Sequence, residues 1–326
     1  MEAKREITFD LMKGLAILAM LCGHCIIPNV LHSFIYIWHM PLFFVVSGYF
    51  YHPKSRTKCL KSSFFGLLVP YFITCGVALG VSLVLSMENS HKIFYGTLGV
   101  SSEWFGSNAM VGYGGNGPLW FLIALFWCRI IYDALRRIIT NKWLFGGAIL
   151  FLSVLCVVVG NKYYVPFYIA HGMAALVFYY VGNLVHLMNV DKRKCKSWFF
   201  ILMLCVMALG MMVGEPYFYA LYFPNWIVNV LAALSACAVI YYLCSQIKNN
   251  KFAHMLAYIG RLSLLLLSVH SLDYMFSFSK AIVYTRLSLE GKGASLLFDS
   301  MLFIIPLFGI VFLPKMSLIR KIFKIA

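Results

Sequence analysis

Three ionisable side chains interrupt an apolar stretch near the start of the chain, DLMKGLAILAMLCGH: Asp10, Lys13 and His24. An α-helix turns about 100° per residue, so Lys13 and His24 lie on one face, about 16 Å apart along the axis. Asp10 lies three residues before Lys13 and can pair with it on that face. Ionisable groups in a membrane helix usually face a protein interior or a wet cavity. The pattern therefore predicts an internal polar line, the alternative being a snorkelling lysine and a separately satisfied buried histidine.

A second apolar stretch, HSFIYIWHMPLFFVVSGYFY, carries His39 beside Pro41, which can kink a helix. Ser47 follows near its inner end. Adjacent antiparallel helices can bring His24 and His39 close together, and two imidazoles suit proton transfer because histidine titrates near neutral pH. Two separate hydrogen-bonded histidines are the alternative interpretation.

Two further segments carry candidate binding residues. GPLWFLIALFW places Trp120 at the start of an apolar run, where its position favours a membrane-interface belt over a pocket wall. In YIGRLSLLLLSVHSLDY, Arg261 and His270 are nine residues apart and face different directions on a helix. Asp273 follows His270 by three residues and can orient its ring.

The elements that position these residues are membrane helices. The chain has 326 residues, of which 62% are hydrophobic and 12% charged, with a mean hydropathy of +0.84. Soluble proteins are about 45–50% apolar and about 25% charged. We therefore expect an all-α, polytopic membrane protein forming one integral-membrane domain over residues 1–326. Ten apolar runs are long enough to cross a bilayer: 11–29, 33–51, 63–86, 118–135, 143–160, 166–188, 197–214, 224–244, 254–276 and 298–314.

The distribution of basic residues predicts the orientation of these spans. The face that holds both termini carries 19 lysines and arginines, and the opposite face carries 5. Cytoplasmic loops are enriched in these residues, so we expect both termini in the cytoplasm. The net charge of +16 then reflects loop bias and predicts no nucleic-acid partner. Two long outer segments, 87–117 and 277–297, are interpreted either as lids or as passive connectors.

Several kinds of site are absent from the sequence. Several of the ten cysteines lie within apolar runs, which predicts buried thiols and no metal. The chain also lacks GxSxG, HExxH and P-loop motifs.

Four segments, taken together and in order, resemble the membrane-bound acyltransferase 3 family, and most closely its fucose 4-O-acetylase-like branch: DLMKGLAILAMLCGH, WHMPLFFVVSGYF, GPLWFLIALFW and IGRLSLLLLSVH. The family's first helix carries Arg, ten residues, then His; here Lys13 and His24 have that spacing, and a lysine there resembles the fucose-acetylase branch. Lysine lacks the guanidinium fork, so it cannot bind a phosphate or carboxylate in the bidentate manner of arginine. The nearest equivalent of the family's RxxR motif is the pair Lys58 and Lys61.

The resemblance implies transfer of an acyl group from cytosolic acyl-CoA, typically acetyl-CoA, to a sugar hydroxyl of a cell-envelope glycan or exopolysaccharide, in a bacterial inner membrane. In this hypothesis His24 is the general base or the acyl relay, and His39 assists with protons or orients the substrate. Lys13, held by Asp10, binds the donor or stabilises charge. General-base assistance contributes typically 10²–10⁴-fold in rate.

Two sets of binding residues complete the hypothesis. CoA is polyanionic and the predicted inner face is basic. We therefore expect four residues of this face to attract the CoA phosphates: Lys58, Lys61, Arg136 and Arg137. The residues expected to bind the acceptor lie in or beside the resembling segments: Ser47, Trp120, Arg261 and His270. The alternative function is a transporter or flippase for a glycolipid or acidic substrate. Such proteins often contain inverted repeats, and their absence from the sequence favours the enzyme.

Overall fold

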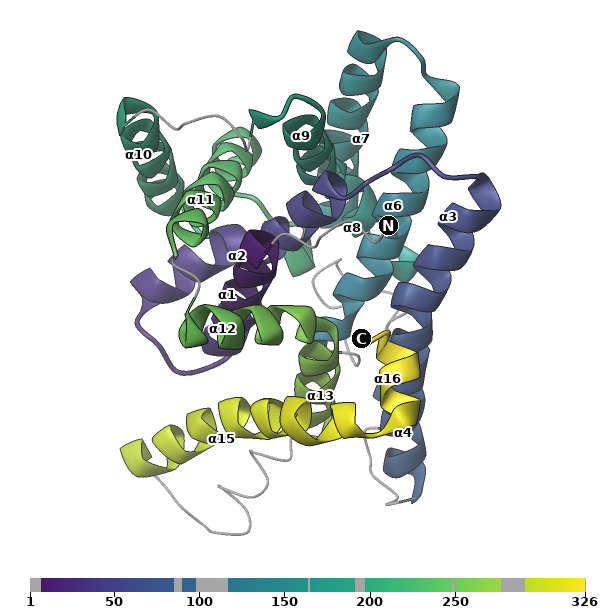
Figure 1. Cartoon of the computed structure of the whole chain (residues 1–326), viewed down its shortest axis with the longest axis vertical. Helices are drawn as coiled ribbons and strands as arrows, with labels where there is room; N and C mark the ends of the chain where they lie inside the picture. Colours follow the sequence, from purple (N-terminus) through teal and green to yellow (C-terminus); the bar gives the residue numbers. More distant parts are fainter. Residues whose placement is uncertain are drawn as a thin grey trace.

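The structure is a computed structural model that describes residues 7–84, 90–97, 117–163, 165–190, 197–247, 250–276 and 291–325. The regular elements of these residues are helices (Figure 1). The α-helices are α1 (Ile7–Gly23), α2 (Asn29–Tyr49), α3 (Arg56–Ser63), α4 (Val69–Val84), α5 (Ser90–Thr97), α6 (Trp120–Ile138), α7 (Lys142–Lys162), α8 (Ile169–Ala174), α9 (Leu176–Leu187), α10 (Ser197–Val213), α11 (Trp226–Gln246), α12 (Lys251–Arg261), α13 (Ser263–Phe276), α15 (Gly291–Phe312) and α16 (Ser317–Phe323). Short 3-10 turns are η2 (Gly117–Leu119), η3 (Pro166–Tyr168), η5 (Phe218–Ala220) and η7 (Leu313–Lys315).

The all-helical, multi-pass prediction agrees with this arrangement. Six helical stretches among the described residues are long and apolar enough to cross a membrane, and two bent helix pairs raise the number to eight if each pair is one span. α1 and α10 have 17 residues each and are shorter than those six stretches. The count of ten spans and the cytoplasmic termini therefore stay predictions. Most of the two candidate lid segments, including residues 98–116 and 277–290, lies outside the described residues.

Two predicted spans are bent, which hydropathy alone does not indicate. The run at 254–276 forms α12 and α13, which meet at an angle of 64°. The run at 166–188 forms η3, α8 and α9, with a bend of 46° between α8 and α9. Beyond the first bend, α13 contacts α1, and its later part reaches His24, whose ring lies 5.0 Å from that of His270.

The helix predicted at 63–86 begins earlier, at Arg56, and contains a π-helical turn, η1 (Phe64–Leu68), between α3 and α4. π turns inside α-helices are rare and frequently lie at functional sites. Helix α16 packs beside α4, so two segments that are far apart in the sequence lie side by side (Figure 1).

Glycines allow α1 and α12 to approach closely. A Cβ atom at Gly260 would overlap the backbone carbonyl of Asp10, and one at Gly14 would overlap the carbonyl of Leu256. Small residues are the usual means by which helices in a membrane bring their backbones together. This crossing places the end of α12 next to the beginning of α1.

The Ser47 region is a second close crossing. The neighbouring Gly48 faces the backbone of Tyr179 on α9, where a Cβ atom would overlap the carbonyl oxygen. Ser47 itself is half-buried and is not among the residues that line the cavity described below. α2 continues through Pro41 as one helix, so the expected kink does not interrupt it. The serine predicted to bind substrate thus lies in a helix-packing region.

Candidate active site

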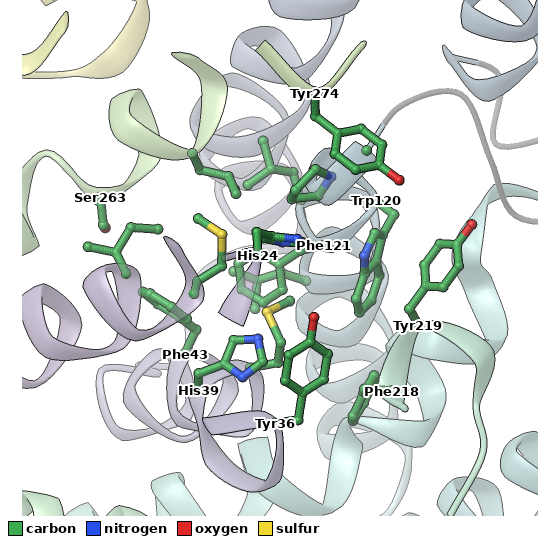
Figure 2. Close-up of a pocket in the computed structure, with 18 of the residues that line it drawn as sticks. His24, Tyr36, His39, Phe43, Trp120, Phe121, Phe218, Tyr219, Ser263 and Tyr274 are labelled. Atoms are coloured by element: carbon green, nitrogen blue, oxygen red, sulfur yellow. The ribbon is translucent and has the colours of Figure 1, made fainter. Parts of the chain in front are cut away.

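A cavity of about 430 Å³ opens between α1, α2, α6, α13 and the loop that joins α10 to α11 (Figure 2). α1 contributes Ile17 and Met20 from one of its faces, and His24 follows directly after the helix. Lys13 continues this line one turn earlier but does not line the cavity. Of the face predicted from Lys13 to His24, the cavity is therefore lined by the part from Ile17 onward.

His24 lies one residue beyond the end of α1, because this helix ends at Gly23 rather than at the predicted residue 29. Its ring centroid is 5.0 Å from that of His270 and 6.2 Å from that of Tyr274. His39 lines the same cavity, and its ring packs on Tyr36 at 5.1 Å. The structure therefore brings His24 and His39 to one cavity, with His270 packed against the His24 ring.

His39 is held in one tautomer. Its Nδ1 lies 2.8 Å from the carbonyl oxygen of Ile35, one turn earlier in α2. A carbonyl oxygen only accepts hydrogen bonds, so Nδ1 carries the proton and Nε2 of the neutral ring carries the lone pair. His39 consequently presents a nitrogen that can accept a proton or a hydroxyl hydrogen.

His270 is buried, does not line the cavity, and packs against the His24 ring. Neither of its ring nitrogens has a hydrogen-bond partner in the described part of the chain. The prediction that Asp273 orients His270 by a hydrogen bond is therefore wrong. Spacing placed the two residues on neighbouring helix positions, but it did not determine which way their side chains turn.

Beneath the cavity, one carboxylate joins α1 to α12. The Lys13 ammonium lies 2.7 Å from Asp10 Oδ1, which confirms the predicted pair, and an Arg261 guanidinium nitrogen lies 3.7 Å from Oδ2. The Asp10 side chain is only 3% exposed. Two cations therefore share one buried carboxylate where α1 crosses α12. Arg261 does not line the cavity itself, and it also packs on the Tyr258 ring at 5.9 Å.

Trp120 forms a wall of the cavity. It is 6% exposed, and its ring stacks near Phe218 and Tyr219, each with centroids 6.0 Å away (Figure 2). A tryptophan of a membrane-interface belt faces lipid headgroups, whereas this ring is enclosed by protein. The belt interpretation was wrong because a position at the end of an apolar run does not reveal the loop that covers it.

That loop, residues 214–225, supplies site residues that the sequence reasoning missed. Tyr217, Phe218 and Tyr219 line the cavity. The loop is fixed from outside: His171 Nε2 lies 2.8 Å from the Tyr219 carbonyl, and Asn229 Nδ2 donates to the Gly214 carbonyl at 3.1 Å. Partial burial and the Glu215 carboxylate raise the pKa of Tyr217, which keeps its hydroxyl protonated. The dense aromatic run PYFYALYF between two apolar stretches was the available indication.

A second hollow, of about 640 Å³, lies between α3 and the C-terminal helix α16. Five lysines line it: Lys54, Lys58, Lys61, Lys321 and Lys324. We call it the lysine pocket. No carboxylate is among its lining residues in the described part of the chain, so the ammonium groups repel one another and favour an anionic ligand.

The π turn forms a wall shared by the two hollows. Leu67 lines the histidine-containing cavity, whereas Phe65 lines the lysine pocket. Lys324 extends over the same turn, with its Nζ 3.7 Å from the position that a Cβ atom of Gly66 would occupy. The two hollows are therefore separated by a single helical turn.

The two arginines predicted to attract CoA phosphates are placed differently. Arg137 pairs with Asp133 at 2.7 Å, and it also bonds the Lys54 carbonyl. Arg136 lies over the Phe145 ring at 5.2 Å. Neither lines the lysine pocket. Arg137 instead attaches the segment before α3 to α6, and thereby supports the pocket from behind.

The described residues contain no group of three or more His, Cys, Asp or Glu side chains that could hold a metal ion.

Comparison with known proteins assigns the fold to a family. Neither the search of curated proteins nor the search of solved structures found a match. The acyltransferase 3 family, described as an acyltransferase domain, matches residues 6–318, which include every residue that lines the histidine-containing cavity but not Lys321 and Lys324 of the lysine pocket. Because this match covers nearly the entire chain and the helices are apolar enough to cross a bilayer, the protein belongs to the acyltransferase 3 family of multi-pass membrane acyltransferases.

Proposed function

We propose that the protein is an O-acetyltransferase that moves an acetyl group from cytosolic acetyl-CoA to a sugar hydroxyl of a cell-envelope glycan or exopolysaccharide, in a bacterial inner membrane. One observation carries this proposal: His24, His39 and Trp120, from three separate motifs, line a single cavity. The family assignment supports acyl transfer, and the cavity supports a hydroxyl acceptor.

The proposed chemistry needs a proton acceptor beside the sugar. An imidazole, His24 or His39, takes the proton of the acceptor hydroxyl while the oxygen attacks the thioester carbonyl. The C–S bond then breaks, and the CoA thiolate takes up a proton to leave as the thiol. The fixed Nε2 lone pair of His39 makes it a second candidate for the base, beside His24.

The lysine pocket is the proposed site for the donor's phosphates. CoA carries a pyrophosphate and a ribose phosphate, and lysine ammonium groups bind phosphates as point charges. From this pocket the pantetheine arm needs to pass only the π turn to deliver the thioester to the histidines. Lys58 and Lys61 keep their proposed role, and Lys54, Lys321 and Lys324 join them.

A transporter or flippase is the alternative. The residues that line the cavity in the described structure include no lysine or arginine, so the cavity offers no counter-charge to an acidic cargo. It offers imidazole, phenol and indole groups, which suit an uncharged polyol. The cavity thus favours the enzyme over transport of an acidic substrate.

Purified protein in detergent tests the proposal directly. With radiolabelled acetyl-CoA and a panel of methyl glycosides, we expect CoA release and an acetylated sugar identified by mass spectrometry. Movement of a fluorescent glycolipid across proteoliposomes, without release of CoA, would instead support the flippase.

We also propose that ten spans place both termini and the segment before α3 in the cytoplasm. A cysteine introduced at Ser55, in a variant that lacks the native cysteines, should resist a membrane-impermeant maleimide in intact cells and react in inverted vesicles. The expected result follows from the excess of basic residues on this face, 19 against 5. Labelling of this cysteine from outside intact cells would reverse the orientation.

Neutralising the lysine pocket should weaken donor binding. Replacing Lys58 and Lys61 together with alanine should raise the KM for acetyl-CoA more than it lowers kcat, because the phosphates lie away from the reacting atoms. Added salt should weaken donor binding in the wild type and have less effect in the variant. Lys142→Ala is the control, since this lysine lies over the Trp143 ring at 5.4 Å and does not line the pocket. An unchanged KM for acetyl-CoA would place the phosphates elsewhere.

A further inference from the structure

A carboxylate–imidazole pair lies at the edge of the histidine-containing cavity and has no part in the mechanism above. His32 Nδ1 is 2.9 Å from Glu215 Oε1 and 3.1 Å from Oε2. The Ser33 hydroxyl donates to Glu215 Oε2 at 2.8 Å. The Glu215 side chain is 12% exposed and that of His32 is 28% exposed. The pair therefore joins the start of α2 to the loop at 214–225.

The carboxylate determines which nitrogen of His32 is available. A carboxylate only accepts, so Nδ1–H donates to Glu215 and Nε2 is left for another partner. His32 lines the cavity and stacks on the Tyr36 ring, with centroids 4.1 Å apart and planes inclined by 20°. The Tyr36 ring also packs on His39, with centroids 5.1 Å apart. Contacts between neighbouring side chains thus connect Glu215, through His32 and Tyr36, to His39, one of the two proposed bases.

The loop is also held by bonds that do not involve this pair. The bonds from His171 and Asn229 already fix two of the loop's carbonyls, and Tyr217 and Tyr222 pair through their backbones. Glu215 is thus one of several groups that hold the loop, and it is placed to orient the His32 ring as well.

We propose that His32 binds the acceptor and that Glu215 is the positioning residue of His32, an inference that rests on the proposed function. His32 Nε2 accepts a hydrogen bond from a second hydroxyl of the sugar while the first hydroxyl faces His24 and His39. The sugar ring packs on the aromatic wall that includes Tyr36 and Trp120 (Figure 2). The acceptor class is then an uncharged polyhydroxylated ring, and neither a monohydric alcohol nor an acidic sugar fits this arrangement.

Binding without chemistry tests this inference separately from the proposed function. Calorimetric titration with methyl fucoside, in the absence of acetyl-CoA, needs no acyl transfer. Loss of one hydrogen bond to a sugar hydroxyl should weaken binding by about tenfold in His32→Ala. The exposed His254 provides a matched control, and His254→Ala should bind as the wild type does. A wild type that binds methyl fucoside no better than His32→Ala, or a wild type that binds no methyl glycoside, would overturn the inference.

The same variants separate positioning from a general structural role. Glu215→Ala should raise the acceptor KM, leave the KM for acetyl-CoA unchanged, and add no further loss in the His32→Ala background, because it acts through His32. Glu215→Gln should recover most of the affinity, since its amide oxygen still accepts from Nδ1–H. An undiminished Glu215→Ala effect in the absence of His32, or a rise in both KM values together, would contradict the positioning role. If these binding results hold but no acetylated sugar forms, the proposed function fails and the binding site stands.

Discussion

Replacing His24 with alanine is expected to abolish acyl transfer and to leave the folded protein in the membrane. His24 lines the cavity at the end of α1, and its position matches the histidine of the acyltransferase 3 motif. Loss of a general base costs roughly 10²–10⁴-fold in rate, and loss of an acyl relay costs all of it. Acetyl transfer by purified protein, normalised to the monodisperse fraction in detergent, measures the effect.

His24→Gln distinguishes chemistry from packing. Glutamine keeps most of the volume and the hydrogen bonding of histidine, but it cannot take up a proton near pH 7. We therefore expect His24→Gln to be as inactive as His24→Ala. Near-normal activity of the glutamine variant would make His24 a binding or structural residue. The base would then be His39, whose Nε2 lone pair is already fixed, with the buried His270 as the other candidate.

Replacing Gly260 with leucine is expected to prevent correct assembly of the membrane domain. A side chain at this position overlaps the backbone carbonyl of Asp10, and a backbone has no flexible end that can move aside. Overpacking typically costs about 1–3 kcal/mol and occasionally more. Here the separation of α1 from α12 also breaks the contact between Asp10 and Arg261. Thermal unfolding in detergent should show a lower Tm, together with loss of activity.

Gly147→Leu is the matched control for this substitution. Gly147 lies within a helix of similar apolar character, α7, and a Cβ atom there would meet no heavy atom within 4 Å. Its Tm should stay close to that of the wild type. Equal destabilisation of the two leucine variants would mean that the close crossing of α1 and α12 does not determine stability.

Features set by helical geometry could be predicted from the sequence. The pair formed by Asp10 and Lys13, and the shared face that leads to His24, follow from a rise and a turn that hardly vary between helices. The apolar runs likewise located the helices, because every membrane helix must cover its backbone with apolar side chains.

Features that depend on distant parts of the chain could not be predicted. Lys321 and Lys324 join Lys58 only because α16 folds back along α4, a contact with no local indication in the sequence. The Arg137 guanidinium forms an ion pair with Asp133, one turn earlier in the same helix. A count of basic residues does not show which of them are already paired. The wall at 214–225 was missed because a short connection between spans gave no reason to expect a fixed conformation.

The π turn at Phe64–Leu68 makes the orientation of α3 depend on the exact number of residues in this segment. A π turn corresponds to one extra residue in an α-helix, and each residue rotates the helix by about 100°. The turn therefore sets the angular phase of α3 relative to α4, with Phe65 toward the lysines and Leu67 toward the histidines. Deleting one residue here would straighten the helix and rotate α3 away from α16, although no charge or cavity side chain need be lost. The number of residues in this turn thus determines whether α3 and α16 can together form the lysine pocket beside the histidine-containing cavity.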